Sequence, residues 1–304
     1  MKTGGKRSNT LVCFGAILFL AVGSACRSRA IQSSVEDTSG PEKSTSARII
    51  EADDFYRQRK DLSNARRGII ALGQARTRDS GNYEVAWKLA RLEYYLGSHA
   101  KDDAEREAAF RDGIEAGKAA VQLQDNKADG HFWLGANYGG SAQTSILASL
   151  SSIQDIRAQM EKVLELDESY QGGSAYLGLG ELYFKAPKVL GGDSKKAVEY
   201  LEKGLRFGSD NALLHLRLAE AYHALGRDQD ARKQIDFILK MKPDPDYVPE
   251  YADAVAGAKE LEKRIKENSI VSGTDFSLWL CIGYRLKSMP LFVASCLLGG
   301  PWTK

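Results

Sequence analysis

Apolar residues recur at helical spacing from about residue 46 to residue 267, and strict alternation of apolar and polar positions is nearly absent there. Spacings of three and four residues are typical of amphipathic α-helices, whereas alternation is typical of strands. The segment is also rich in Ala and Leu and poor in Pro, which favours helices. We expect about eleven helices, at residues 46–60, 62–76, 83–97, 103–123, 127–140, 150–166, 170–185, 193–206, 210–225, 228–241 and 248–266.

One tyrosine recurs in this segment at a spacing close to 40 residues. Tyr56, Tyr94, Tyr138, Tyr183 and Tyr222 are separated by 38, 44, 45 and 39 residues. A period of this length is typical of solenoids in which each repeat is a pair of helices. The period therefore predicts a stack of helical hairpins.

Residues 212–243 follow the tetratricopeptide pattern without an insertion. The small Ala219 and Ala231 allow the two helices of the unit to approach closely. Gly226 supplies the turn between them, and Pro243 ends the second helix. We therefore predict the all-α class, with the architecture of a tetratricopeptide-like solenoid of helical hairpins.

The last predicted helix, 248–266, has a single apolar stripe. Ala254, Ala258, Leu261 and Ile265 follow one another at spacings of four, three and four residues. One buried stripe suits a helix that covers the open end of a stack. We expect a C-terminal capping helix.

The N-terminus has the layout of an export signal. Lys2, Lys6 and Arg7 precede an uncharged apolar run of about a dozen residues, which is too short to span a bilayer comfortably. Small residues then precede Cys26, an arrangement that resembles the bacterial lipobox, in which the cysteine is lipidated and becomes the first residue. Gly23 stands where Leu is usual, and the alternative is ordinary cleavage nearby with Cys26 a bystander.

Four segments follow from these patterns. Residues 1–25 are predicted to be a lipoprotein-type signal peptide, and the Ser/Thr-rich residues 26–45 a flexible tether. Residues 46–267 are the repeat domain, and residues 268–304 are an apolar tail. Cleavage would lower the formal net charge from +2 to about −1, so no basic excess remains for a nucleic-acid partner. We expect the protein in the periplasm, anchored to a bacterial membrane by an N-terminal lipid.

The tail departs from the repeat pattern. Arg285 and Lys287 lie in the middle of its apolar run, and each would cost about 2.5–3.5 kcal/mol at the centre of a membrane helix. A functional tail and an aberrant C-terminus from a shifted reading frame both fit. The spacing leaves open whether Cys281 and Cys296 pair in an oxidising compartment.

Residues that carry enzyme chemistry do not cluster in the sequence. The four histidines form no HExxH motif, and no metal site or cofactor is predicted. His131 and His215 occupy the same repeat position and are expected to pack between helices. The glycine-rich residues 186–195 lack the order of a phosphate loop, and acidic runs such as Asp53-Asp54 are expected to be solvated helix surface or charge in the first turn of a helix. We therefore predict that the protein is not an enzyme.

Adjacent aromatic residues on several predicted helices suggest a binding surface. Neighbours on a helix point in different directions, so one of each pair is expected to face a concave surface or an internal channel. Ordinary core on the two sides of a buried helix is the alternative. The candidate residues for a ligand or partner surface are Tyr95, Trp133, Tyr176 and Phe184.

Four strings in the repeat domain resemble the T-component family of tripartite ATP-independent periplasmic (TRAP) transporters. They are NYEVAWKLAR at 82–91, HFWLGANYG at 131–139, MEKVLELD at 160–167, and the segment 187–197 with its LGGD. The resemblance implies a lipid-anchored periplasmic protein with degenerate tetratricopeptide repeats. It also implies a homo-oligomer with a channel through the protomer, which associates with the transporter's substrate-binding protein.

Our first hypothesis is accordingly an accessory protein that binds this substrate-binding protein and helps deliver an apolar or organic-acid ligand. The second is a general tetratricopeptide scaffold lipoprotein that organises a protein complex of the cell envelope. A peptide held by the concave face would favour the scaffold, and a closed apolar tunnel would count against it. An enzyme would need His and carboxylate side chains that meet in one cleft.

Overall fold

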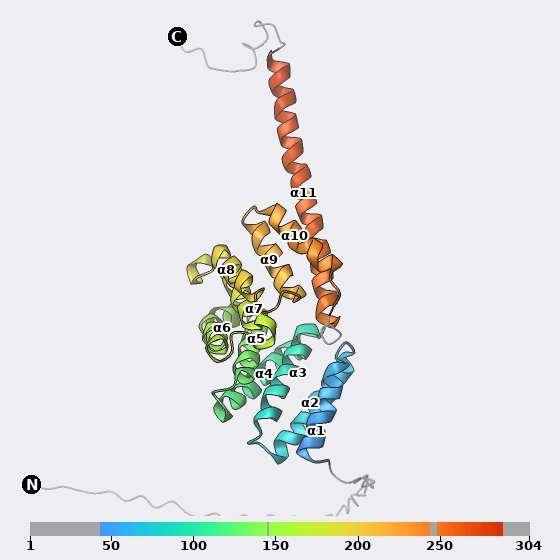
Figure 1. The fold of residues 1–304 in the computed structure, drawn as a ribbon, viewed down its shortest axis with the longest axis vertical. Coiled ribbons are helices and arrows are strands. Elements are labelled where there is room, and N and C mark those ends of the chain that lie inside the picture. The colour runs from blue at the N-terminus through green and yellow to red at the C-terminus, as the bar shows by residue number, and fades with distance from the viewer. Residues whose placement is uncertain (1–42, 145, 244–247, 288–304) are drawn as a thin grey trace, which may run out of the picture. The chain divides into compact units, whose positions relative to one another are not determined.

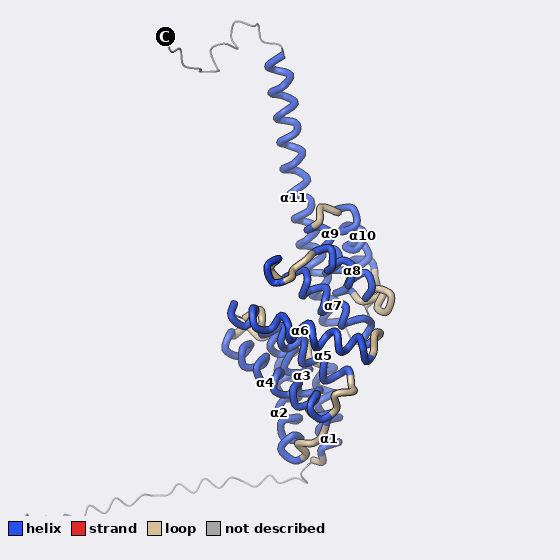
Figure 2. Tube along the Cα trace, turned by 90° about the vertical axis from the view of Figure 1, so that its left-hand side faces the viewer, coloured by secondary structure: helices blue, strands red, loops and turns tan. Residues whose placement is uncertain are grey.

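The computed structural model describes residues 43–144, 146–243 and 248–287, with side chains described in 43–144, 152–243 and 248–268. In these ranges every regular element is a helix (Figures 1 and 2). The elements are α1 (Thr45–Arg57), α2 (Leu62–Arg78), α3 (Tyr83–His99), α4 (Asp103–Leu123), α5 (Ala128–Ser141), α6 (Ile146–Leu166), α7 (Tyr170–Lys185), η1 (Lys188–Leu190), α8 (Ser194–Gly204), α9 (Ala212–Ala224), α10 (Asp228–Lys240) and α11 (Val248–Lys287). Each predicted helix corresponds to one of these α-helices, and the predicted fold class is confirmed.

The odd-numbered helices form an inner wall. Each helix packs on its neighbours in sequence, which gives five hairpins from α1–α2 to α9–α10. In addition α1 contacts α3, α3 contacts α5, α5 contacts α7, α7 contacts α9, and α9 contacts α11. This arrangement places the first helix of every hairpin on one continuous surface, as in other helical-repeat solenoids.

Close packing of consecutive helices, both within a hairpin and between hairpins, depends on glycines. A Cβ atom on Gly180 of α7 would lie only 2.5 Å from Leu201 Cγ of α8. A Cβ on Gly117 of α4 would lie 2.9 Å from the Cα of Leu134 on α5. These helices therefore lie closer to each other than an alanine would allow.

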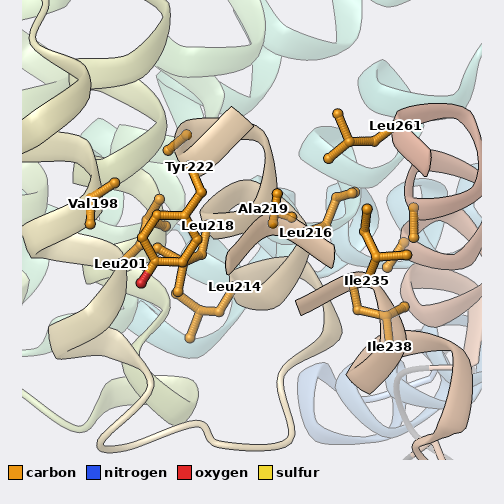
Figure 3. Packing of buried hydrophobic residues seen from close by; sticks show 14 of the residues in the cluster. Val198, Leu201, Leu214, Leu216, Leu218, Ala219, Tyr222, Ile235, Ile238 and Leu261 are labelled. Carbon is orange, nitrogen blue, oxygen red and sulfur yellow. The ribbon is translucent and has the colours of Figure 1, made fainter. Parts of the chain in front are cut away.

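The largest core cluster joins α7 to α11. In Figure 3 Leu201 of α8 and Leu214 of α9 lie in the left half of the view, Ile235 and Ile238 of α10 lie on the right, and Leu261 of α11 lies above Ile235. Each of these side chains is at most 1% exposed. The C-terminal hairpin and α11 thus share one apolar core.

The predicted apolar stripe of the last helix is buried as expected. Ala254, Ala258, Leu261 and Ile265 are all 0% exposed, and α11 packs on α9 and α10. The prediction of a C-terminal capping helix is confirmed.

This helix does not end near residue 266, as the sequence suggested, but continues to Lys287. Gly273 costs a helix only about 1 kcal/mol relative to Ala, and no proline occurs between Pro249 in the first turn and Pro290. Residues 268–287 of the predicted tail therefore belong to α11, and residues 288–304 lie outside the described ranges. None of the helices in the described ranges is both long and apolar enough to cross a membrane.

His131 and His215 fill equivalent positions in their hairpins, as predicted. The Nδ1 atom of His131 lies 2.7 Å from Gln159 Oε1, and its Nε2 lies 2.9 Å from the carbonyl oxygen of Asp125. His215 makes the corresponding contacts, 2.6 Å to Gln234 Oε1 and 2.8 Å to a backbone carbonyl. Both rings therefore pack between the two helices of a hairpin.

Glu93 on α3 is a buried carboxyl whose ionisation makes the stability of the fold depend on pH. Burial, and to a smaller extent the negative charge of Asp112, raise the pKa of this carboxyl from its ordinary value of 4.5 to about 8. Between about pH 4.5 and pH 8 the unfolded chain releases a proton that the folded chain keeps, so stability falls as the pH rises.

We expect Glu93→Gln to remove this slope, which amounts to at most about 1.4 kcal/mol per pH unit. Urea unfolding at pH 5, 6, 7 and 8 measures it. Glu107→Gln, at an exposed position on α4, is the control. An unchanged slope in Glu93→Gln would show that the carboxyl ionises normally in the folded protein.

Candidate ligand cavity on the inner wall

A cavity of about 710 Å³ lies against the inner wall. Its lining residues come from α1, α3, α5 and α7, from the first turns of α9 and α11, and from adjoining loops. The volume is within the range of about 300–1,000 Å³ that is typical of small-molecule sites. All five hairpins and the capping helix thus contribute to one candidate site.

The structure separates the four aromatic residues that the sequence singled out. Tyr95 and Trp133 line the cavity. The ring of Tyr176 instead stacks on Phe207 with centroids 5.9 Å apart, and its hydroxyl donates to Glu168. Phe184 is partly buried against the C-terminal core. Tyr95 and Trp133 are brought together on the cavity wall, whereas the other two lie elsewhere; a ligand role stays a prediction for all four.

Both members of two adjacent aromatic pairs reach the cavity. Tyr94 lines it beside Tyr95, and Phe132 lines it beside Trp133. We expected only one residue of each pair to face the inner surface. Both do so here, because the cavity extends over a broad face of the inner helices. Burial is the main cause that raises the pKa of both Tyr94 and Tyr95 to about 12, so their hydroxyls are neutral at physiological pH.

A cluster of charged side chains forms the part of the wall between α1 and α3. Asp53 accepts hydrogen bonds from Lys88 and, at 2.8 Å, from Nη2 of Arg91. Lys88 also pairs with Glu84 at 2.7 Å and is only 7% exposed. The expectation that Asp53 lies on solvated surface is therefore wrong, since it holds two cations at the cavity.

Arg91 keeps hydrogen-bonding capacity after this pairing. Its guanidinium carbon lies 3.8 Å from the centroid of the Tyr56 ring and 5.0 Å from that of Trp87. In the described part of the chain its Nε has no hydrogen-bond partner, and neither has the indole Nε1 of Trp133. Buried donors normally have an acceptor. Two residues of the cavity wall thus carry buried donors that none of the described residues accepts from.

An ion pair joins the capping helix to the first hairpin across the cavity. Arg59, in the loop after α1, donates from Nε and Nη2 to the carboxylate of Glu250 in the first turn of α11, at 2.8–3.0 Å. Arg59 is 2% exposed and lies over the rings of Tyr56 and Tyr95. The two ends of the repeat domain, 191 residues apart in sequence, therefore meet at this pair.

A second contact between these ends is more exposed. His99 Nε2 at the end of α3 lies 3.3 Å from Asp253 Oδ2 on α11, and the Asp253 side chain is 63% exposed. Screened surface pairs of this kind contribute little. Arg59 and Glu250 are thus the stronger of the two connections.

A left-handed turn positions the wall at the beginning of α7. Gln171, Gly172 and Gly173 have φ values of 43°, 60° and 77°. A Cβ on Gly173 would lie 2.7 Å from the carbonyl oxygen of Gly204, so only glycine fits there. This turn and Gly208 of the next loop both line the cavity. Close backbone packing, and not a side chain, fixes this part of the wall.

A smaller cavity of about 200 Å³ adjoins the large one. Tyr94, Phe132, Ala136, Ser174 and Leu177 line both. The rest of its wall is largely apolar. The smaller cavity thus lies next to the large one, between α5, α6 and α7, and Glu181 and Lys185 add charged groups to its lining.

Sequence reasoning missed the charged part of the site. Lys88 and Arg91 follow Trp87 on a helix whose other residues are mostly apolar. Two cations on such a helix were the signal in the sequence that could have indicated a charged part of the site. In the described ranges no group of three or more His, Cys, Asp or Glu side chains has the arrangement of a metal site. The wall can therefore hold apolar groups against aromatic rings and an acceptor against Arg91.

The fold and the cavity define the class of protein, a tetratricopeptide-type helical solenoid. A thermophilic TPR protein of Thermus thermophilus is similar, with a TM-score of 0.53 and 19% identity over 70% of this chain and 100% of that one. The pilF protein of Pseudomonas aeruginosa gives a TM-score of 0.45 and 19% identity over 71% and 93%. No curated protein matches the chain significantly.

The family follows from the sequence. The TRAP transporter T-component family matches residues 86–268, more than half of the chain. The chain belongs to this family, as the four strings suggested. The family and the TPR fold support an accessory role in TRAP transport, in association with the transporter's components, and both are non-enzymatic in kind.

Proposed function

We propose that this protein binds the substrate-binding component of a TRAP transporter and holds the transported ligand in its inner cavity during delivery. The cavity of about 710 Å³, to which every hairpin contributes, is the observation that carries the proposal. Its aromatic rings suit apolar parts of a ligand, and Arg91 suits an acidic part. The proposed site of action is the periplasm, with Cys26 as the lipid anchor.

The closure by α11 favours this function over a general scaffold. A tetratricopeptide scaffold grips a peptide along an open concave face. Here Arg59 and Glu250 join the ends of the solenoid beside the cavity. A long peptide lying along the inner wall would have to pass the contact between Arg59 and Glu250. A small molecule fits in the cavity without passing it.

Association with the purified substrate-binding protein of the same transporter tests the proposal. We expect the mature chain to bind that protein in calorimetry, and a ligand preloaded on one protein to pass to the other. Lack of association, with and without ligand, would overturn the proposal. Specific binding of an extended peptide at the inner wall would favour the scaffold.

The anchor has its own test. We expect Cys26→Ser to move the protein from the membrane fraction to the soluble periplasmic fraction, because it removes the acceptor of the lipid. Immunoblots of separated fractions measure the shift, and Cys13→Ser, in the same signal segment, is the control. Unchanged fractionation of Cys26→Ser would rule out the lipobox interpretation.

A further inference from the structure

The loop between α7 and α8, residues 186–193, is largely exposed but has a fixed backbone. The carbonyl oxygen of Pro187 accepts hydrogen bonds from the amides of Leu190 and Gly192, at 2.8 and 3.0 Å. Gly191 has a φ of 94°, in the left-handed region that favours glycine. A Cβ on Gly192 would lie 1.8 Å from a backbone carbonyl oxygen, so this position also needs glycine. The loop therefore holds one shape.

The tip of this loop presents an apolar side chain to solvent. Val189 is 92% exposed, whereas Ile50, the next most exposed large apolar side chain in the described ranges, is 63% exposed. The neighbouring Leu190 is partly buried against the core between α6 and α7. Single exposed apolar residues are common on protein surfaces. Val189 is unusual because the fixed backbone, with Leu190 on its packed side, keeps it from turning inward.

Four cations without carboxylate partners lie in or beside the loop. Lys188 is in the loop, Lys195 and Lys196 are in the first turn of α8, and Arg157 is on α6. Among the residues that the structure describes, none of the four forms a salt bridge. Asp193, the nearest acidic residue in sequence, accepts from the amides of Lys195 and Lys196 as the N-cap of α8. The four positive charges are thus available to an anion.

Arg157 lies at the base of the loop. Its Nη2 would lie 3.4 Å from a Cβ on Gly191. Its guanidinium carbon and the Nζ of Lys196 each lie 5.5 Å from the ring centroid of Tyr183. The Nε of Arg157 is buried and has no hydrogen-bond partner in the described part of the chain. Two cations thus lie against one ring, and one of them keeps an unused donor.

An apolar tip beside unpaired cations has the chemistry of a membrane-binding loop. Anionic phospholipids attract lysine and arginine side chains near the membrane surface. An apolar side chain beside these cations can enter the boundary between head groups and acyl chains. A soluble anion would use the cations but would leave Val189 in water. The combination therefore favours a lipid surface.

We propose that the loop 186–193 docks on a membrane of anionic phospholipids, with Val189 between the head groups and the four cations beside the phosphates. This inference goes beyond the proposed function and does not rest on it. The contact is reversible and is weakened by salt, so it adds to a lipid anchor and does not replace one. A flexible tether leaves a domain free to rotate. A second contact fixes which side of the solenoid faces the membrane.

Flotation with lipid vesicles tests the proposal on the mature chain with Cys26→Ser, which has no lipid of its own. We expect binding to vesicles of phosphatidylglycerol and phosphatidylethanolamine. Binding to vesicles of phosphatidylcholine alone should be at least about tenfold weaker, because the cations then meet no net negative charge. A higher salt concentration should weaken binding to the anionic vesicles.

Substitutions in the loop separate the apolar contact from the ionic contacts. Val189→Ser should weaken binding to the anionic vesicles by about tenfold. Lys188→Gln and Lys195→Gln should each weaken it by about fivefold. The matched controls are Ile50→Ser on α1 and Lys101→Gln before α4, which should leave the affinity unchanged. All five positions are exposed, so thermal unfolding of every variant should match that of the parent chain.

Equal binding to anionic and neutral vesicles, or no binding to either, would overturn the proposal. Full binding by the loop variants would also overturn it, because another part of the chain would then make the contact. Glycerol phosphate distinguishes a lipid surface from a site for a soluble anion. If it binds as tightly as the anionic vesicles do, the loop holds a soluble anion and the membrane assignment is wrong.

Discussion

Replacing Glu250 with Ala is expected to lower the free energy of unfolding by about 3 kcal/mol, because the buried guanidinium of Arg59 would lose the hydrogen bonds and the negative charge of the Glu250 carboxylate. Arg59 is 2% exposed and donates three hydrogen bonds to the Glu250 carboxylate. The aromatic rings on either side stabilise a cation but cannot accept these hydrogen bonds in full. We expect the loss of local stability to be largest where α11 contacts the first hairpin.

Urea unfolding and amide hydrogen exchange in α11 measure this effect. Asp253→Ala is the matched control, since it removes the other contact between α11 and the N-terminal hairpins at an exposed site. We expect that control to change stability by less than about 0.5 kcal/mol. Equal effects of the two substitutions on the free energy of unfolding would mean that burial of Arg59 does not determine how strongly α11 is held against the first hairpin.

Leu201→Ala is expected to destabilise the protein by about 3 kcal/mol, because it leaves a cavity in a core where Leu201 is 0% exposed. Gly180→Ala alone should cost about 1–3 kcal/mol through its clash with the Leu201 side chain. In the double variant the new methyl group enters space that Leu201 has vacated. The two costs should therefore sum to more than the cost of the double variant, by at least about 1 kcal/mol.

A double-mutant cycle by chemical denaturation measures this coupling. Gly180→Ala combined with Leu72→Ala, in the separate core cluster of α1 to α5, is the control and should be additive within about 0.5 kcal/mol. Additivity in the Gly180 and Leu201 cycle would contradict the close packing of α7 on α8.

Helix positions were predictable because the information is local. The apolar stripe of α11 and the equivalent histidines of α5 and α9 follow from spacing alone. N-caps are equally local: Asn82 accepts from the amide of Val85, and Asp102 from that of Glu105. The length of α11 was missed, because the apolar stripe on which the prediction of this helix rested ends at Ile265.

The cavity was predictable only in part, because it depends on how the helices are rotated against each other. Tyr95 and Tyr176 lie in similar sequence surroundings, yet one faces the cavity and the other stacks on Phe207. Asp53 and Arg91 are 38 residues apart, and their pairing arises from contact between α1 and α3. Nothing local distinguishes Asp53 from a solvated carboxylate.

The joined ends of the solenoid have a mechanical consequence. The curvature of such a protein is the sum of small rotations from one repeat to the next. Because Glu250 holds Arg59, the two ends of the solenoid are fixed to each other. A changed rotation at any hairpin must therefore be compensated by changed rotations at the other hairpins, or it strains the contact between Arg59 and Glu250. The width of the enclosed cavity therefore depends on contacts far from its wall: substitutions between hairpins, remote from every wall residue, can widen or narrow it.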